Sequence, residues 1–194
     1  MKMSSLQYNF LAKILLLGEF RVGKSSMVLR YVEDRFPGDY MATIGANFLV
    51  KTVMLEIGGK VYKTGLQIWD IGGHARSSQV GRVFFQGVSG ALLVYDLTRH
   101  STFKNIESKW YHDYAKFTDS KSKGNFLLIG NKIDLNESRI ISKEEGEHLA
   151  SKLKATEFIE TSAKHGDNVE KTPPSKLPRV KLACSVLPTL LKSL

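Results

Sequence analysis

The pattern G-x-x-x-x-G-K-S at residues 18–25 constrains the fold of this chain more than any other sequence feature. It directly follows an apolar run at residues 11–17 that is typical of a buried strand, and it opens a helical stretch at residues 24–33. A glycine-rich loop between a strand and a helix presents backbone N–H groups at the helix N-terminus, where an anion binds. The pattern therefore predicts a phosphate-binding strand–loop–helix unit. For this motif alone, an ordinary glycine-containing turn is the alternative.

Short apolar runs alternate with amphipathic ones along the rest of the chain, to about residue 170. The runs predict further strands at residues 46–57, 61–71, 91–96, 126–129 and 157–160. The first two of these are joined by Gly58-Gly59, a hairpin turn signal. Strands that alternate with helices predict an α/β fold with a mostly parallel sheet and one antiparallel hairpin.

Two helices are expected besides the one that follows the glycine-rich loop. One covers residues 101–117 with Ser101 as its N-cap. The other opens at Ser142, which forms a capping box with Glu145, and runs to about Leu153.

Length and composition allow one domain with a tail. The chain has 194 residues, and domains usually hold about 100–200. No apolar run approaches the roughly 20 residues of a transmembrane helix, and the N-terminus lacks the pattern of a signal peptide. The single cysteine, Cys184, excludes an internal disulfide and a cysteine-rich zinc site. A cytoplasmic protein is therefore expected.

The net charge of +9 is uneven, because residues 171–194 hold five basic residues, no acidic residue and four of the five prolines. The boundary between the domain (1–170) and the tail (171–194) is placed at this change in composition. Since most of the excess charge lies in the tail, nucleic-acid binding is not expected.

A second motif, N-K-x-D at residues 131–134, follows the expected strand at 126–129. It therefore lies at the carboxyl edge of the sheet, where doubly wound folds bind ligands. The Asp134 carboxylate can accept hydrogen bonds from both N1–H and the exocyclic amine of guanine. Adenine has no such donor pair on that edge and would leave the carboxylate unpaired. The motif thus favours guanine and disfavours an ATP-using P-loop kinase or ATPase, although alone it is compatible with a helix-entry loop.

Five motifs in order resemble those of the Ras-superfamily small GTPases, and most of all the Rab branch, over about residues 9–170. They are the two motifs above, Thr43-Ile44-Gly45, Trp69-Asp70-Ile71-Gly72-Gly73-His74, and Glu160-Thr161-Ser162-Ala163-Lys164. The resemblance implies the three-layer, six-stranded fold of a P-loop GTPase. It also implies a GTP/GDP switch that uses Mg²⁺ and regulates vesicle traffic through effectors, with an exchange factor and a GTPase-activating protein as further partners.

The resemblance also assigns roles to residues. Ser25, Thr43 and Asp70 would hold Mg²⁺, and Lys24 would reach the β- and γ-phosphates. The Gly73 N–H would sense the γ-phosphate, and His74, Gly73 and Lys24 are the candidate catalytic residues. Other nucleotide contacts are expected from Glu19, Phe20, Arg21, Val22, Gly23, Ser26, Phe36, Tyr40, Asn131, Lys132, Asp134, Ser162, Ala163 and Lys164.

Three aromatic residues, Phe48, Trp69 and Phe84, match the surface on which Rab effectors dock. Simple core packing is the alternative for these side chains, because buried aromatics are common without any functional role.

Two departures from the family pattern concern catalysis. His74 stands where the family has the glutamine that orients the attacking water, although translational GTPases use a histidine once the ribosome orients it. Phe20 and Arg21 stand at small-residue positions of the phosphate loop. Phe20 should crowd the space beside the γ-phosphate, whereas Arg21 is expected to point to solvent. Since positioning dominates phosphoryl transfer, slow hydrolysis is expected. A GTP-bound interaction module without turnover is the alternative.

The third departure is the C-terminus. Pro173-Pro174 should end the last helix of the family almost at its start. We expect one of three outcomes: a truncated helix, a short replacement helix between Pro178 and Pro188, or a loosely ordered tail. Cys184 is not placed as a terminal prenylation box, so no prenyl anchor and only weak membrane contact through basic residues are expected.

Overall fold

The computed structural model describes residues 7–37, 43, 45–57, 59–72, 78–119, 122 and 124–169. These residues form a sheet with the strand order β2-β3-β1-β4-β5-β6. The strand bounds are β1 Phe10–Leu17, β2 Ala46–Ile57, β3 Lys60–Ile71, β4 Gly90–Asp96, β5 Phe126–Asn131 and β6 Glu157–Thr161. β2 and β3 pair antiparallel, and the other neighbours pair parallel. The predicted six-stranded, mostly parallel sheet with one antiparallel hairpin is therefore confirmed.

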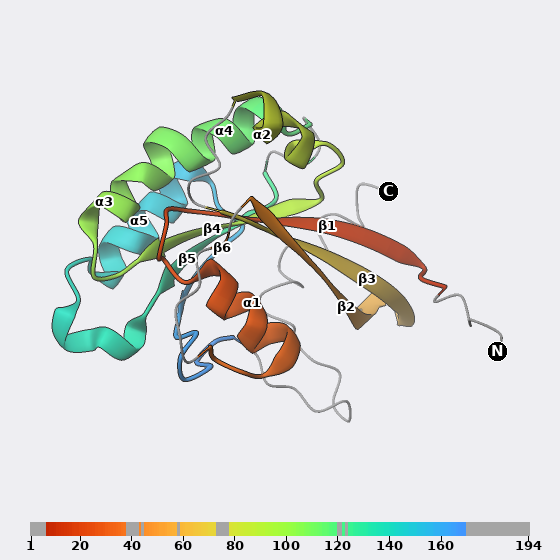
Figure 1. Cartoon of the computed structure of the whole chain (residues 1–194), viewed down its shortest axis with the longest axis horizontal. Helices are drawn as coiled ribbons and strands as arrows, with labels where there is room; N and C mark the ends of the chain where they lie inside the picture. The colour runs from red at the N-terminus through yellow and green to blue at the C-terminus, as the bar shows by residue number, and fades with distance from the viewer. Residues whose placement is uncertain are drawn as a thin grey trace.

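Helices cover both faces of the sheet and complete the three layers (Figure 1). α1 lies on one face, and α2, α3, α4 and α5 lie on the other. The helix bounds are α1 Lys24–Glu33, α2 Ser78–Phe85, α3 His100–Asn105, η1 Ile106–Tyr111, α4 His112–Phe117, η2 Ile133–Ser138 and α5 Lys143–Leu153. The predicted capping box at Ser142 and Glu145 is confirmed, because both of its hydrogen bonds are present.

The strand β1 explains why the first apolar run is nearly continuous. Its alternate side chains Ile14 and Leu16 belong to the core beneath α1, whereas Leu15 and Leu17 belong to the core on the opposite face. A strand buried on both faces needs apolar residues at every position. Because β1 lies in the middle of the sheet, between β3 and β4, the loop that follows it begins at the centre of the sheet's carboxyl edge.

The predicted helix at residues 101–117 needs two corrections. It begins at His100 with extended Arg99 as N-cap, so the prediction that Ser101 is the N-cap is wrong. The Asp96 carboxylate accepts hydrogen bonds from the N–H and hydroxyl of Thr98, and this turn sets the start of the helix earlier. The helix also passes through the π-helical segment η1 before it continues as α4. The sequence patterns missed α2 and the 3₁₀ helix η2 altogether.

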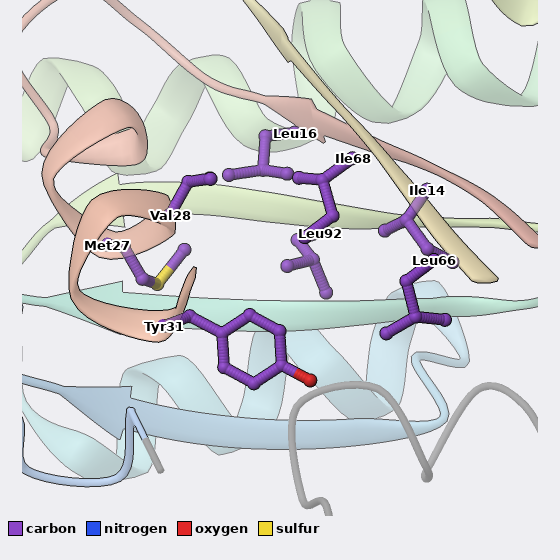
Figure 2. A pocket seen from close by; sticks show the side chains of 8 residues that line it. All are labelled: Ile14, Leu16, Met27, Val28, Tyr31, Leu66, Ile68 and Leu92. Atoms are coloured by element: carbon purple, nitrogen blue, oxygen red, sulfur yellow. The ribbon is translucent and has the colours of Figure 1, made fainter. Parts of the chain in front are cut away.

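A small apolar cavity of about 30 Å³ lies between α1 and the sheet (Figure 2). Met27, Val28 and Tyr31 of α1 face Ile14, Leu66 and Leu92 of the strands across it. Its volume is about that of one water molecule, and its lining offers almost no polar surface. It is a packing gap and is far too small for a nucleotide.

The described chain ends at Val169, which is fully buried in the core beneath α1. Pro173-Pro174, the tail from residue 171 and the expected change to the last helix lie outside the described residues. Within the described ranges, no helix combines the length and apolarity that a membrane span requires.

Candidate nucleotide site

The phosphate loop (residues 18–25) connects β1 to α1 and has a shape that two of its glycines permit. Gly18 has φ +152°, and a Cβ there would lie 2.2 Å from the Val94 carbonyl oxygen. Gly23 has φ +97°, and a Cβ there would lie 2.3 Å from Nδ2 of Asn131. Any side chain at either position would clash with a neighbouring strand end. The two glycines therefore let the loop close tightly against β4 and β5.

Lys24, at the start of α1, turns its side chain back over this loop. Its Nζ donates hydrogen bonds to the carbonyl oxygens of Gly18 at 2.8 Å and Glu19 at 3.1 Å. The side chain is buried, and burial lowers the pKa of the ammonium to about 8. Lys24 thus places a desolvated cation in the loop, where an anionic phosphate would be strongly favoured.

The two unusual loop residues lie side by side. Arg21 has φ +62°, in the left-handed region, and its exposed guanidinium lies 5.3 Å from the centre of the half-buried Phe20 ring. The Phe20 carbonyl oxygen accepts a hydrogen bond of 2.7 Å from Nη2 of Arg99. The loop therefore keeps its path here through backbone contacts and not through a small side chain.

Three oxygen-bearing side chains converge at the start of α1. Ser25 Oγ donates to Oδ2 of Asp70, and it lies 2.7 Å from Thr43 Oγ1. Thr43 Oγ1 lies 3.4 Å from the same carboxylate oxygen. The other carboxylate oxygen, Asp70 Oδ1, is buried and accepts no hydrogen bond from the described residues. One carboxylate and two hydroxyls suit Mg²⁺, a hard cation that also takes oxygen from bound phosphates.

The described residues hold no cluster of three or more His, Cys, Asp or Glu side chains that would bind a metal by themselves. The candidate cation site therefore depends on the Ser25, Thr43 and Asp70 oxygens. It fits an ion shared with a phosphate better than an ion enclosed by protein alone.

Asn131, at the end of β5, links the phosphate loop to the end of β6 and to the loop that follows it. Its Nδ2 donates to the Val22 carbonyl at 2.8 Å. Its Oδ1 accepts from Thr161 Oγ1 at 3.0 Å and from the Ala163 N–H at 3.2 Å. Asn131 is 1% exposed, so these bonds have little competition from water. One buried amide thus ties together residues that lie far apart in the sequence.

The other members of the N-K-x-D motif face different partners. Lys132 has φ +77°, and its Nζ lies 2.7 Å from Oδ2 of Asp96. Asp134 accepts a hydrogen bond of 2.7 Å from Ser162 Oγ through its Oδ1. Residues 131–134 and 162–164 (the base loops) therefore share side-chain hydrogen bonds at one edge of the sheet.

Arg30 of α1 supports the second base loop through backbone oxygens. Its Nε donates to the Ala163 carbonyl at 3.2 Å, and its Nη2 donates to the Lys164 carbonyl at 2.8 Å. Ala163 is buried and Lys164 is exposed. The helix α1 thus contacts both parts of the site. Its N-terminus adjoins the phosphate loop, and Arg30 near its C-terminal end holds the second base loop.

The remaining predicted site residues divide into two sets. Ser26 is half-buried beside Ser25 on α1, and Phe36 is 43% exposed in the segment after α1. Tyr40, Gly73 and His74 lie outside the described residues. The Gly72 N–H, directly before Gly73 in the sequence, donates to the Gly45 carbonyl at 2.8 Å.

The three predicted effector aromatics touch one another in a row. Phe48 lies opposite Trp69 in the β2–β3 pairing, with ring centres 5.0 Å apart, and Trp69 lies 5.9 Å from Phe84 of α2. Phe48 is 47% exposed, and Trp69 and Phe84 are half-buried. Phe48 therefore lies at the surface, whereas Trp69 and Phe84 also pack against the core on the side of α2, as the core-packing alternative expects.

Sequence reasoning missed several residues that hold these loops. Asp96, the last residue of β4, reaches Lys132, and Arg99, three residues later, reaches Phe20. Arg30 reaches the second base loop. Only Asp96 carried a signal, because it is an acidic residue at the carboxyl end of a buried parallel strand.

Three features meet at the carboxyl edge of the mostly parallel sheet: the phosphate loop, the oxygen atoms of Ser25, Thr43 and Asp70, and the base loops. Together they are typical of a P-loop nucleotide-binding protein. Comparison with known proteins gives the family. The Ras family model matches residues 13–176. The chain belongs to the Ras family, the small GTPases, and its relatives at about 40% identity are of the Rab type.

Three relatives illustrate this similarity. The chain is 41% identical over 162 residues to Ras-related protein SEC4 of Saccharomyces cerevisiae, covering 84% of this chain and 71% of SEC4. It is 39% identical over 165 residues to Ras-related protein RIC1 of Oryza sativa subsp. japonica, covering 85% and 78%. It is 39% identical over 163 residues to Ras-related protein Rab-8B of Pongo abelii, covering 84% and 75%.

Proposed function

We propose that this protein is a Rab-type molecular switch that binds GTP and GDP with Mg²⁺ and regulates vesicle and membrane traffic through effectors. The observation that carries the proposal is the side chain of Asn131. It joins the phosphate loop at Val22 to the base loop at Ala163. A site built in this way holds both ends of one nucleotide in a fixed relation.

At the phosphate end, backbone N–H groups of residues 19–26 surround the β-phosphate, and the Lys24 ammonium contacts the β- and γ-phosphates. Ser25, Thr43 and Asp70 would hold Mg²⁺, which when bound neutralises phosphate charge. Thr43 would close over the γ-phosphate together with the Gly73 N–H, and Tyr40 is a further expected nucleotide contact. These contacts order two loops in the GTP form and release them after hydrolysis.

At the base end, the Asp134 carboxylate accepts from guanine N1–H and the exocyclic amine. The Ala163 N–H, which contacts Asn131 Oδ1 at 3.2 Å in this structure, would donate to guanine O6 when the base is bound. The Lys132 stem would pack over the ring, and Phe36 would meet its edge. Ser162 holds the Asp134 carboxylate in place through the hydrogen bond of 2.7 Å. The base loops therefore read guanine with a preorganised acceptor, which an adenine would leave unpaired.

The effector surface is the aromatic row of Phe48, Trp69 and Phe84. The row has an exposed member, Phe48, and in the sequence Phe48 and Trp69 lie within five residues of Thr43 and Gly73. Both features support an effector surface. Effectors, an exchange factor and a GTPase-activating protein are the expected protein partners. The proposed place of action is the cytoplasm and, transiently, the cytoplasmic face of endomembranes.

Hydrolysis is proposed to be slow, with His74, Gly73 and Lys24 as the catalytic residues. A neutral imidazole carries its donor and its acceptor on separate ring nitrogens that point apart, so it cannot present both from one group to water and phosphate as a glutamine amide does. The Phe20 side chain belongs to the phosphate loop and adds bulk there. The second candidate function, a GTP-bound interaction module without turnover, rests on these same two residues. Single-turnover phosphate release from GTP-loaded protein separates the two functions.

The test of the proposed function is the nucleotide retained by the purified protein. We expect bound GDP or GTP on chromatographic analysis, and displacement of a fluorescent GDP analogue by GDP but not by ADP. Equal competition by ADP and GDP would contradict guanine recognition and the proposed switch.

A further inference from the structure

The first half of the phosphate loop is held from outside by a residue that no motif includes. Arg99, the N-cap of α3, uses two edges of its guanidinium. Nη2 donates to the Phe20 carbonyl oxygen at 2.7 Å, and Nε donates to Oδ2 of Asp96 at 2.9 Å. A planar guanidinium can serve two acceptors at fixed angles, which a lysine ammonium cannot do in the same way.

The anchor of this contact is Asp96, whose side chain is 1% exposed. Burial by itself raises the pKa of its carboxyl, but hydrogen bonds from Lys132 and Thr98 outweigh it and hold the pKa below its usual value. The carboxylate is therefore ionised, and it pairs with Arg99 and with Lys132 of the base loop. One buried charge thus orients a cation toward each half of the nucleotide site.

The same segment touches the loop a second time. Glu19 Oε1 accepts from Asn105 Nδ2 at 3.2 Å and from Lys109 Nζ at 3.1 Å. Lys109 lies in the π-helical segment η1, and π-helical turns are frequent at functional sites. Two successive loop residues are therefore tied to residues 99–109.

The contact at Phe20 has a direct consequence for the next N–H group. The peptide bond between Phe20 and Arg21 is trans, as are the other peptide bonds of the described residues. The carbonyl and the N–H of a trans peptide point in opposite directions. Because Arg99 binds the Phe20 oxygen from the α3 side, the Arg21 N–H points away from α3. Phosphate loops bind anions through N–H groups whose directions are fixed in this way.

We propose that Arg99 is a positioning residue that fixes the Phe20–Arg21 peptide of the phosphate loop and thereby slows nucleotide release. The inference rests on the proposed nucleotide site and deepens it. Arg21 is in the left-handed conformation, which is unfavourable for an L-residue, so the loop would tend to relax without a tether. Arg99 acts on the backbone, so its effect concerns the phosphates and not the base.

The experiment measures release of a fluorescent GDP analogue from full-length protein, in excess GDP and Mg²⁺, for three variants. Arg99→Ala should release the nucleotide about tenfold faster, the order expected for losing a hydrogen bond from a charged donor. Arg99→Lys keeps a cation beside Asp96 but cannot bridge to Phe20. It should recover thermal stability while release stays fast. Lys143→Ala, which removes an exposed ion pair with Glu147 on α5, should match the unmodified protein.

A second readout separates positioning from general loosening. The ratio of affinities for GDP and IDP, which lacks the exocyclic amine, should stay the same in Arg99→Ala, whereas affinity for both falls. Unchanged release in Arg99→Ala would overturn the inference. Full recovery of slow release in Arg99→Lys would also overturn the inference. In that case Arg99 would act only by neutralising the charge of Asp96, and its hydrogen bond to Phe20 would have no effect on release. Failure of the unmodified protein to bind GDP would instead overturn the proposed function, before any variant is made.

Discussion

Asn131→Ala is the substitution that should uncouple the phosphate loop from the base loops. The Asn131 side chain is 1% exposed and makes all three of its hydrogen bonds to other elements. Its partners are the Val22 carbonyl, the Thr161 hydroxyl and the Ala163 N–H. Truncation to alanine removes one donor and one doubly used acceptor together.

The burial of the partners sets the magnitude. Val22 and Thr161 are 0% exposed and Ala163 is 3% exposed, so the groups left behind cannot turn to water. A net contribution of about 1 kcal/mol for each of the bonds predicts a loss of about 3 kcal/mol in the free energy of unfolding. The loss should be accompanied by faster GDP release, since both ends of the site lose their common support.

The assay is urea unfolding followed by tryptophan fluorescence, with GDP supplied at the same multiple of each variant's own dissociation constant. This choice removes the trivial effect of weaker binding on apparent stability. Asn136→Ala, at an exposed position of η2, is the matched control and should change the unfolding free energy by less than about 0.5 kcal/mol. A loss below 1 kcal/mol for Asn131→Ala would refute the reasoning, because the three bonds would then contribute almost nothing.

Four further predictions concern individual groups of the site. Asp134→Asn should shift preference from GDP toward XDP in competitive binding, since the C2 carbonyl of xanthine suits an amide donor; unchanged preference would contradict the assignment. Ser25→Asn should reduce GTP affinity more than GDP affinity in analogue displacement, and an equal loss would remove Ser25 from the γ-phosphate end. Burial lowers the pKa of Lys24 to about 8, and bound phosphate should raise it. GDP affinity should therefore be full below pH 8 and fall as the pH rises above 8. A GDP affinity that stays constant from pH 6.5 to about 9.5 would exclude a role for the Lys24 charge. The double change of Phe20→Gly with His74→Gln should raise single-turnover hydrolysis by one to two orders of magnitude, or about 1.4–2.8 kcal/mol of barrier, whereas either change alone should recover little.

Much of the fold could be predicted because its signals are local. The apolar run before Gly18, the Gly58-Gly59 turn and the capping box at Ser142 each specify an element within a few residues. α2 was missed because its eight residues include Gly81, which weakens a helix, and two exposed residues, Arg82 and Val83. The formation of α2 therefore depends on its packing against the face of the sheet that lies away from α1.

The candidate site divides in a similar way. The motifs predict which loops face the nucleotide, because glycine at Gly18 and Gly23 is dictated by backbone conformation and close contacts. They do not predict which side chains hold the loops. Arg30 and Arg99 each donate to backbone oxygens of residues 79 to 134 positions away in sequence. A carbonyl acceptor exists at every residue, so the sequence contains no pairing signal for such a contact.

These supporting contacts explain how the phosphate loop can diverge at two positions and keep its shape. Gly18 and Gly23 give the loop its close approach to β4 and β5, and the carbonyl oxygens of Phe20 and Val22 are held by Arg99 and Asn131. None of these contacts involves the side chain at position 20 or 21. At these two positions only the backbone is expected to contact the nucleotide, so binding should tolerate the divergence. Hydrolysis depends on side chains beside the γ-phosphate, so the same divergence should slow turnover while leaving binding nearly intact.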